Sequence, residues 1–78
     1  MEYTVTFFTH SGAVKFENFM KQKGIKAVLM PVPRKLSSSC GIAARIDYNG
    51  DIKEIIIEDI DKVYVTNSQG VKLIYTHP

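Results

Sequence analysis

One cysteine and its neighbours are the residues of this chain whose types and spacing could do covalent chemistry. Cys40 is the only cysteine among 78 residues; it follows Ser38 and Ser39, precedes Gly41, and has Arg34 six residues upstream. A thiolate near cations or a helix amino terminus is a strong nucleophile. Serine hydroxyls, backbone amides beside a glycine and an arginine fork can hold an anion. The grouping would suit a thiolate or a persulfide anion, and so a carrier that holds a cargo atom on its sulfur.

The same cysteine has a second interpretation, as a small apolar residue at the start of a strand. The chain would then be an interaction module, or a module that holds an anionic ligand with its basic loop or a sheet edge. His10 also has two interpretations, as a base for the thiol or as a surface residue beside a helix cap. Geometry distinguishes the alternatives, because an exposed sulfur near residues 9–11 favours the carrier and a sulfur in the core favours the structural cysteine.

Length and charge exclude several classes of function. We expect a single domain over residues 1–78, because this length supports only one core. Ten Lys and Arg against eight Asp and Glu give a net charge of +2, too weak a field to favour nucleic acid. We find no paired carboxylates, Ser-His-Asp set or metal cluster, and so expect no enzyme, no metal and no cofactor.

The chain also lacks the patterns of membrane and secreted proteins. No run approaches the roughly 18 apolar residues of a membrane span. The start, MEYTVTFFTH, has neither the basic residues nor the apolar core of a signal peptide. We therefore expect a soluble, cytoplasmic protein that does not bind membranes.

The first half of the chain predicts a strand, a helix and a second strand. Residues 3–8, YTVTFF, alternate apolar and polar side chains as a half-buried strand does. Apolar residues at helical spacing predict a helix over 12–23, with Thr9 or Ser11 as its N-cap. The run IKAVLM then predicts a strand that ends near Met30, where two prolines follow.

A loop and two more strands are predicted further on. The stretch 32–40, VPRKLSSSC, has no apolar periodicity and is rich in proline and serine, as a loop is. Residues 42–48 alternate as a third strand, and residues 71–77 as a fourth. Cys40 therefore stands where the longest loop meets the third strand.

Residues 51–65 have two interpretations. Their isoleucines follow the spacing of a buried helical stripe, and Asp51 with Glu54 three residues on suits a helix start. Against this, Asn49 and Gly50 form a strong hairpin turn, and the residues after it are β-branched, which favours a hairpin over residues 46–57. We adopt the helix and keep the hairpin as the alternative.

With this helix the chain predicts an α+β fold, the ferredoxin-like βαββαβ sandwich, with a four-stranded antiparallel sheet and two helices on one face. In that fold the first strand's end, the first helix's start and the third strand's start share one end of the sheet. We therefore expect His10, Ser11 and the helix amino end to lie beside Cys40, where they would help to hold an anion. The edge strands of so small a sheet leave a homodimer open.

The segment MPVPRKLSSSCGIAARI, after a strand, helix and strand that begin YTVTFFTHSGAVKFENFMKQKGI, resembles the selenium/sulfur (Se/S) carrier protein-like family of small bacterial domains. The likeness covers residues 3–47 well and residues 49–78 more loosely. It implies that Cys40 carries sulfur or selenium as a persulfide or selenosulfide. It further implies as partners a cysteine desulfurase or selenium donor protein and an acceptor enzyme, and it leaves the choice between sulfur and selenium open.

Overall fold

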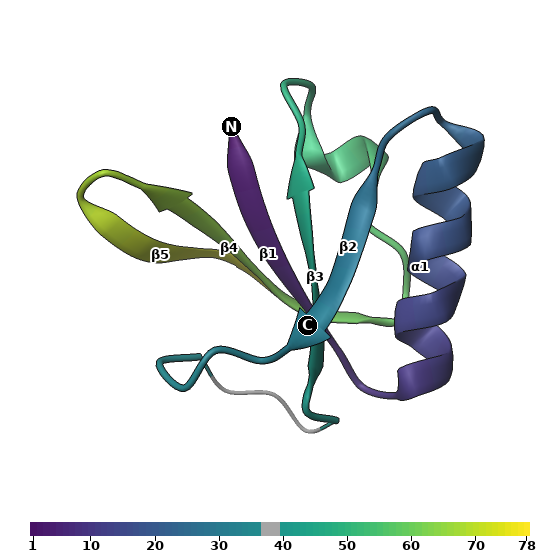
Figure 1. The fold of residues 1–78 in the computed structure, drawn as a ribbon, viewed down its shortest axis with the longest axis horizontal. Coiled ribbons are helices and arrows are strands. Elements are labelled where there is room, and N and C mark those ends of the chain that lie inside the picture. Colours follow the sequence, from purple (N-terminus) through teal and green to yellow (C-terminus); the bar gives the residue numbers. More distant parts are fainter. Residues whose placement is uncertain (37–39) are drawn as a thin grey trace.

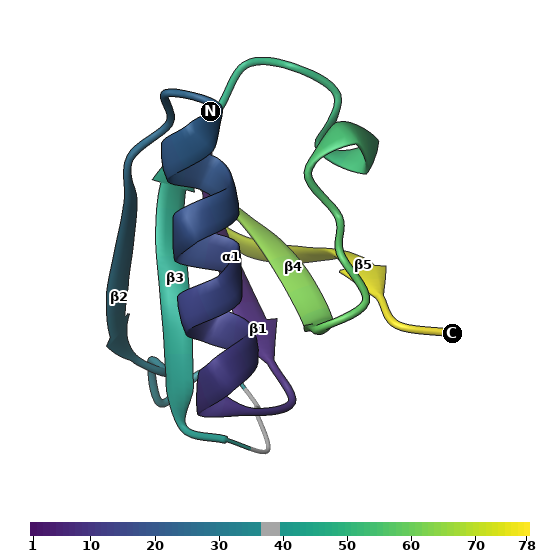
Figure 2. The same ribbon diagram turned by 90° about the vertical axis from the view of Figure 1, so that its right-hand side faces the viewer.

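A computed structural model describes residues 1–36 and 40–78 of the chain. Within them the strands form one antiparallel sheet in the order β2-β3-β1-β4-β5, and α1 packs on one of its faces (Figures 1 and 2). The elements in chain order are β1 (Glu2–Phe7), α1 (His10–Gln22), β2 (Ala27–Pro31), β3 (Ile42–Asp47), the short 3-10 helix η1 (Ile52–Glu54), β4 (Ile60–Asn67) and β5 (Gly70–Thr76).

The first helix is the one predicted, and it begins two residues earlier than expected. Thr9 is its N-cap, because the Thr9 hydroxyl accepts a hydrogen bond from the backbone N–H of Gly12 at 3.0 Å. The helix closes at Lys23, and Gly24 then adopts a φ of +76°, a conformation that glycine reaches without strain. The second and third strands also lie where the sequence predicted them.

The ferredoxin-like prediction is wrong in the second half of the chain. The described residues contain one α-helix and five strands, instead of two helices and four strands. Residues 51–65 form η1, a turn and most of β4, and β4 pairs with β1. The alternative hairpin is also wrong, because β3 pairs with β1 and β2 and not with the residues that follow it.

The isoleucine stripe identified buried residues but not their secondary structure. Ile55, Ile60 and Val63 are all buried, yet they belong to a turn and a strand. The sequence KVYVT at residues 62–66 is rich in β-branched and aromatic residues, and their preference for strands prevails once β1 offers an edge to pair with.

The hydrophobic core lies between α1 and one face of the sheet. The rings of Phe7 in β1 and Phe16 in α1 lie 5.4 Å apart at a tilt of 51°. Burial of each such side chain contributes about 2 kcal/mol relative to exposure. Other side chains buried in this core are Val5, Met20, Ala44, Ile46, Ile55, Ile60 and Val63.

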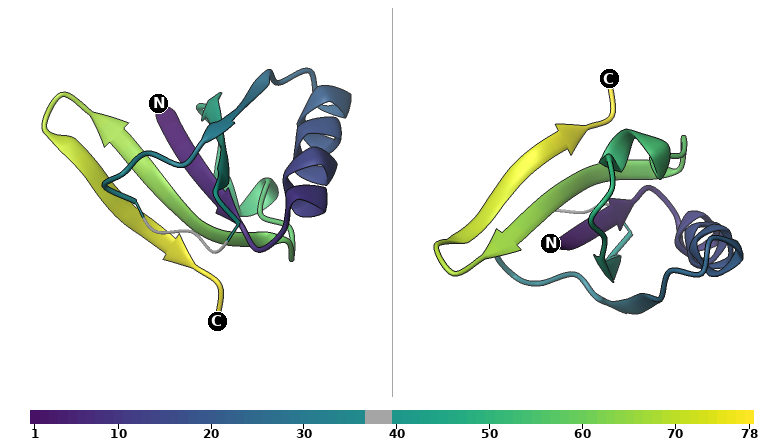
Figure 3. Two further views of the ribbon diagram at one scale, coloured as in Figure 1. Left: turned by 60° about the horizontal axis from the view of Figure 1, so that its bottom comes forward. Right: turned by 90° about the horizontal axis from the view of Figure 1, so that it is seen from above.

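A turn covers part of the sheet face that carries no helix. The N–H of Leu36 donates to the carbonyl of Pro33 at 2.9 Å, and the segment after β2 extends away from α1 toward the β4–β5 hairpin (Figure 3). Pro33, Lys35 and Leu36 line a shallow groove there together with Arg45. The turn helps to explain why Thr4 on that face is only 5 % exposed. No helix in the described part of the chain has the length and apolar character to cross a membrane.

Candidate functional site

Cys40 lies where the loop between β2 and β3 returns to the sheet. The N–H of Val32 donates to the carbonyl of Gly41 at 3.1 Å and joins the two ends of this loop. Gly41 has a φ of +77°, which places it in the left-handed region that side chains rarely adopt. The glycine therefore allows the sharp change of direction between Cys40 and β3.

His10 connects this loop to the helix. Its Nε2 lies 3.0 Å from the backbone carbonyl oxygen of Cys40. A carbonyl oxygen can only accept, so Nε2 must carry the proton in this contact. His10 is the first residue of α1, and the contact confirms the prediction that the helix amino end and Cys40 share one end of the sheet. The contact that links His10 to Cys40 is with the backbone carbonyl of the cysteine.

The sequence left two positions open for the thiol, exposed near residues 9–11 or buried in the core, and Cys40 lies between them. Cys40 as a residue is half-buried and packs against the core. The Sγ atom donates to the carbonyl oxygen of Ile42 at 3.6 Å, a weak hydrogen bond of the kind that sulfur makes. A reaction of the thiolate requires this hydrogen bond to be lost, because the proton that makes it must leave.

Asp59 brings a negative charge to the amino end of α1 that the sequence did not predict. Lys15 Nζ lies 3.3 Å from Asp59 Oδ1, and the N–H of Phe8 donates to the Asp59 carbonyl at 3.4 Å. A Cβ placed on Gly12 would lie 2.8 Å from the Cβ of Asp59. A carboxylate here interacts favourably with the helix dipole. Any anion on Cys40 would share the helix end with Asp59.

Asp59 escaped prediction because it lies in the segment that was assigned to a helix. The one signal for it in the sequence is Gly12, a glycine in the first turn of a helix where alanine would be more stable. Such a glycine marks a close approach of another segment, and here that segment is the turn before β4.

The remaining residues of the predicted site are dispersed. Ser11 is exposed in the first turn of α1. Arg34 is exposed in the turn between Pro33 and Leu36, which lies over the sheet face away from α1. Cys40, by contrast, packs against the core on the α1 side. Ser38 and Ser39 lie outside the described residues. The structure thus brings His10 and Gly41 to Cys40 and places the Arg34 turn on the other face.

A metal centre has no support in the described ranges. Among residues 1–36 and 40–78, no three side chains of His, Cys, Asp or Glu gather in a way that could hold a metal ion.

Comparison with known proteins identifies the family. The family model described as Putative Se/S carrier protein-like matches residues 2–66, which run from β1 through all but the last residue of β4 and include His10 and Cys40. Neither the comparison with characterised proteins nor the comparison with solved structures gave a match. Because the matched region is most of the sequence, the chain belongs to the Se/S carrier protein-like family.

Proposed function

We propose that this protein carries sulfur or selenium on Cys40, receives it from a donor protein and passes it to an acceptor enzyme, with no turnover of its own. The observation that supports the proposal is the contact between His10 and the Cys40 carbonyl, which holds the cysteine at the junction of the loop and α1. Cys40 as a residue is only half-buried there. The family description agrees with this role.

The transfer would be an exchange between sulfur atoms. The Cys40 thiol loses its proton to solvent, and the thiolate attacks the terminal sulfur of a persulfide on a donor such as a cysteine desulfurase. The sulfur–sulfur bond of the donor breaks, its cysteine leaves as a thiolate, and a sulfur–sulfur bond forms at Cys40. Electrons balance without an oxidant. We place the exchange in the cytoplasm, where thiols stay reduced.

Each neighbour of Cys40 would have a distinct role. His10 fixes the position of the Cys40 backbone through its ring N–H, and Gly41 provides the turn into β3. Ser11 and the first amides of α1 lie at the same end of the sheet and can face the terminal sulfur of a persulfide. Arg34, in the turn over the other face, suits contact with a partner better than contact with the persulfide.

Intact-mass measurement tests the proposal. The protein is incubated with a cysteine desulfurase and cysteine, and we expect a gain of one sulfur atom that thiol reductant removes. Cys40→Ser should gain nothing. The same experiment with selenocysteine and a selenium donor protein distinguishes the two cargoes. An unchanged mass for the folded wild-type protein in both arms would contradict the carrier function.

A second candidate is a small interaction module whose cysteine is structural. The hydrogen bond from Cys40 Sγ to the Ile42 carbonyl and the packing of Cys40 on the core favour it. This module predicts that iodoacetamide alkylates Cys40 of the native protein far more slowly than it alkylates the urea-unfolded chain. The carrier predicts native and unfolded rates within about one order of magnitude, because reactive cysteines must be accessible.

A further inference from the structure

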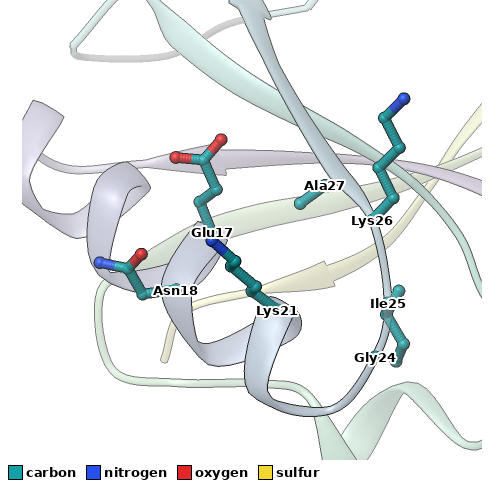
Figure 4. Close-up of a pocket in the computed structure, with 7 residues that line it drawn as sticks. All are labelled: Glu17, Asn18, Lys21, Gly24, Ile25, Lys26 and Ala27. Carbon is teal, nitrogen blue, oxygen red and sulfur yellow. The ribbon is translucent and has the colours of Figure 1, made fainter.

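A groove separates α1 from the beginning of β2, on the flank of the molecule. It has a volume of about 530 Å³, and Figure 4 shows the side chains around it. Glu17, Asn18 and Lys21 of α1 form one wall, and residues 24–27 form the other. Val14, one helical turn before Asn18, is 48 % exposed and extends the apolar surface of the same helix flank. The groove therefore lies beside Ala27, the first residue of the edge strand β2.

The outer edge of β2 has backbone groups directed away from the sheet. In an antiparallel pair, alternate residues direct both backbone groups to the same neighbour. The bond from Val32 N–H to the Gly41 carbonyl sets this alternation, so that Val28 and Met30 face β3. Ala27 and Leu29 then direct their N–H and C=O groups outward, where no described strand pairs with them. Pro31 has no N–H and ends the run.

The net charge of +2 conceals a strong separation of charge along the chain. Residues 21–35 contain five Lys and Arg and no Asp or Glu, whereas residues 47–61 contain six Asp and Glu and one Lys. The first stretch includes β2 and the turn before it, whose residues 24–26 line the groove. Lys21 and Lys26 at the groove are exposed. The groove beside the free edge therefore carries two cations, Lys21 and Lys26, against one carboxylate, Glu17, and is basic on balance.

We infer that the outer edge of β2, with this groove, binds an extended acidic segment of a partner protein, which adds to the sheet as a sixth strand. The outward amides supply the main-chain hydrogen bonds of strand addition, and the groove receives a side chain of the segment where it passes Ala27. The cations favour a segment with Asp or Glu. A second copy paired edge to edge would offer the same cations and no acidic residue from 21–35.

The position of β2 relates this docking surface to Cys40. α1 runs opposite to β2, so its amino end lies at the end of the sheet where β2 finishes and Cys40 returns (Figure 1). A segment of five residues paired with β2 spans about 17 Å. It would extend from the groove to the end of the sheet that carries Cys40. Identification of the partner as the sulfur donor or acceptor rests on the proposed function.

Amide hydrogen exchange tests the docking surface directly. The probe is an acetylated peptide of alternating valine and glutamate, and the control is the same peptide with lysine in place of glutamate. In the protein alone, we expect the Ala27 and Leu29 amides to exchange faster than those of Val28 and Met30. The glutamate peptide should slow exchange at Ala27 and Leu29, less so in high salt. Equal effects of both peptides, or protection confined to β5, would overturn the inference.

Charge reversal separates docking from sulfur chemistry. The double variant Lys21→Glu with Lys26→Glu should raise the concentration that half-saturates sulfur transfer from a desulfurase on the order of tenfold. The control double variant Lys53→Glu with Lys72→Glu changes exposed lysines away from the groove. It should leave the half-saturating concentration unchanged. Loading of Cys40 by inorganic polysulfide, which needs no docking, should be equal in all three proteins.

The outcomes distinguish the two proposals. If wild-type Cys40 gains sulfur from neither the desulfurase nor polysulfide, the carrier function fails. If the desulfurase loads the wild type and the Lys21 and Lys26 variant with the same half-saturating concentration, the docking surface fails and the carrier function stands.

Discussion

The imidazole of His10 donates to the backbone carbonyl of Cys40 across 3.0 Å, although thirty residues separate the two in the chain. The strand order makes this contact, because β1 leads into α1 at the same end of the sheet where the loop enters β3. In the proposed carrier function, this contact gives His10 the role of a positioning residue for the cysteine.

His10→Ala should loosen the loop around Cys40. Loss of one exposed hydrogen bond should lower the free energy of unfolding by about 1 kcal/mol or less, and iodoacetamide should alkylate Cys40 faster because the loop opens more often. Urea unfolding and alkylation rates measure the two effects. The matched control is His77→Ala, since His77 is also exposed but packs on Phe8. Equal alkylation rates in the wild type and His10→Ala would contradict the positioning role.

Gly41→Ala should strain the backbone without a steric clash. A Cβ at Gly41 meets nothing within 4 Å, so the cost comes from its φ of +77° and should be about 1–2 kcal/mol in unfolding free energy. Gly24→Ala provides a matched control, because Gly24 has a φ of +76° and similarly open space but lies at the other end of α1.

We expect the two glycine variants to lose similar stability in urea unfolding, while only Gly41→Ala alters sulfur loading of Cys40. Equal sulfur loading in both variants would show that the conformation of Gly41 does not matter to the site.

Gly12→Ala should destabilise the protein through the contact with Asp59. The new Cβ would lie 2.8 Å from the Asp59 Cβ, so the helix or the turn before β4 must move. We expect a loss of about 1–3 kcal/mol, as for other overpacked sites. Asp59→Gly removes the opposing Cβ and should reduce the cost of Gly12→Ala in a double-mutant cycle followed by thermal unfolding. Additive effects of the two substitutions would contradict the contact.

Tyr48 should titrate at a higher pH than an ordinary tyrosine. Burial, and then the charge and hydrogen bond of Glu54, raise the pKa of Tyr48. The stabilisation from its protonated form is fully present below the unfolded-state pKa of about 10 and is lost as pH rises through the folded-state pKa. A pH titration of tyrosinate absorbance measures the ionisation of Tyr48 when the wild type is compared with Tyr48→Phe and Glu54→Gln. An unaltered Tyr48 titration in Glu54→Gln would contradict the contribution of Glu54.

The sequence predicted the half of the fold that positions Cys40 and also the last strand, β5, but it was wrong on residues 51–65. Thr9 and the glycine after the helix are local signals, and they located α1 to within two residues. The segment 51–65 carried helical spacing and β-branched residues at once, and pairing with β1 decided between them. The turn at residues 67–70 offered a clue, because Asn67 Oδ1 accepts from the Gln69 N–H at 2.8 Å and a side-chain contact of this kind favours a hairpin.

The site was also predicted only in part, because some of its contacts follow from the order of the strands and others depend on loops and turns. The contact of His10 with Cys40 follows from strand order and was foreseeable. The position of the Arg34 turn on the other face could not be predicted, because no residue of the sequence VPRKL specifies which face of the sheet a loop covers. Asp59 reaches the helix only because the turn before β4 exists.

The most direct test of the carrier function follows one sulfur atom onto Cys40 and off it again. The protein is loaded with sulfur by a desulfurase and cysteine and is then purified away from both. It is digested without reductant, and the peptide masses show which peptide carries the extra sulfur. The loaded protein is then treated with cyanide, which takes the terminal sulfur as thiocyanate and leaves the Cys40 thiolate. We predict one extra sulfur on the peptide that contains Cys40 and an equal amount of thiocyanate. Sulfur on no peptide, or thiocyanate of equal yield from Cys40→Ser, would contradict the function.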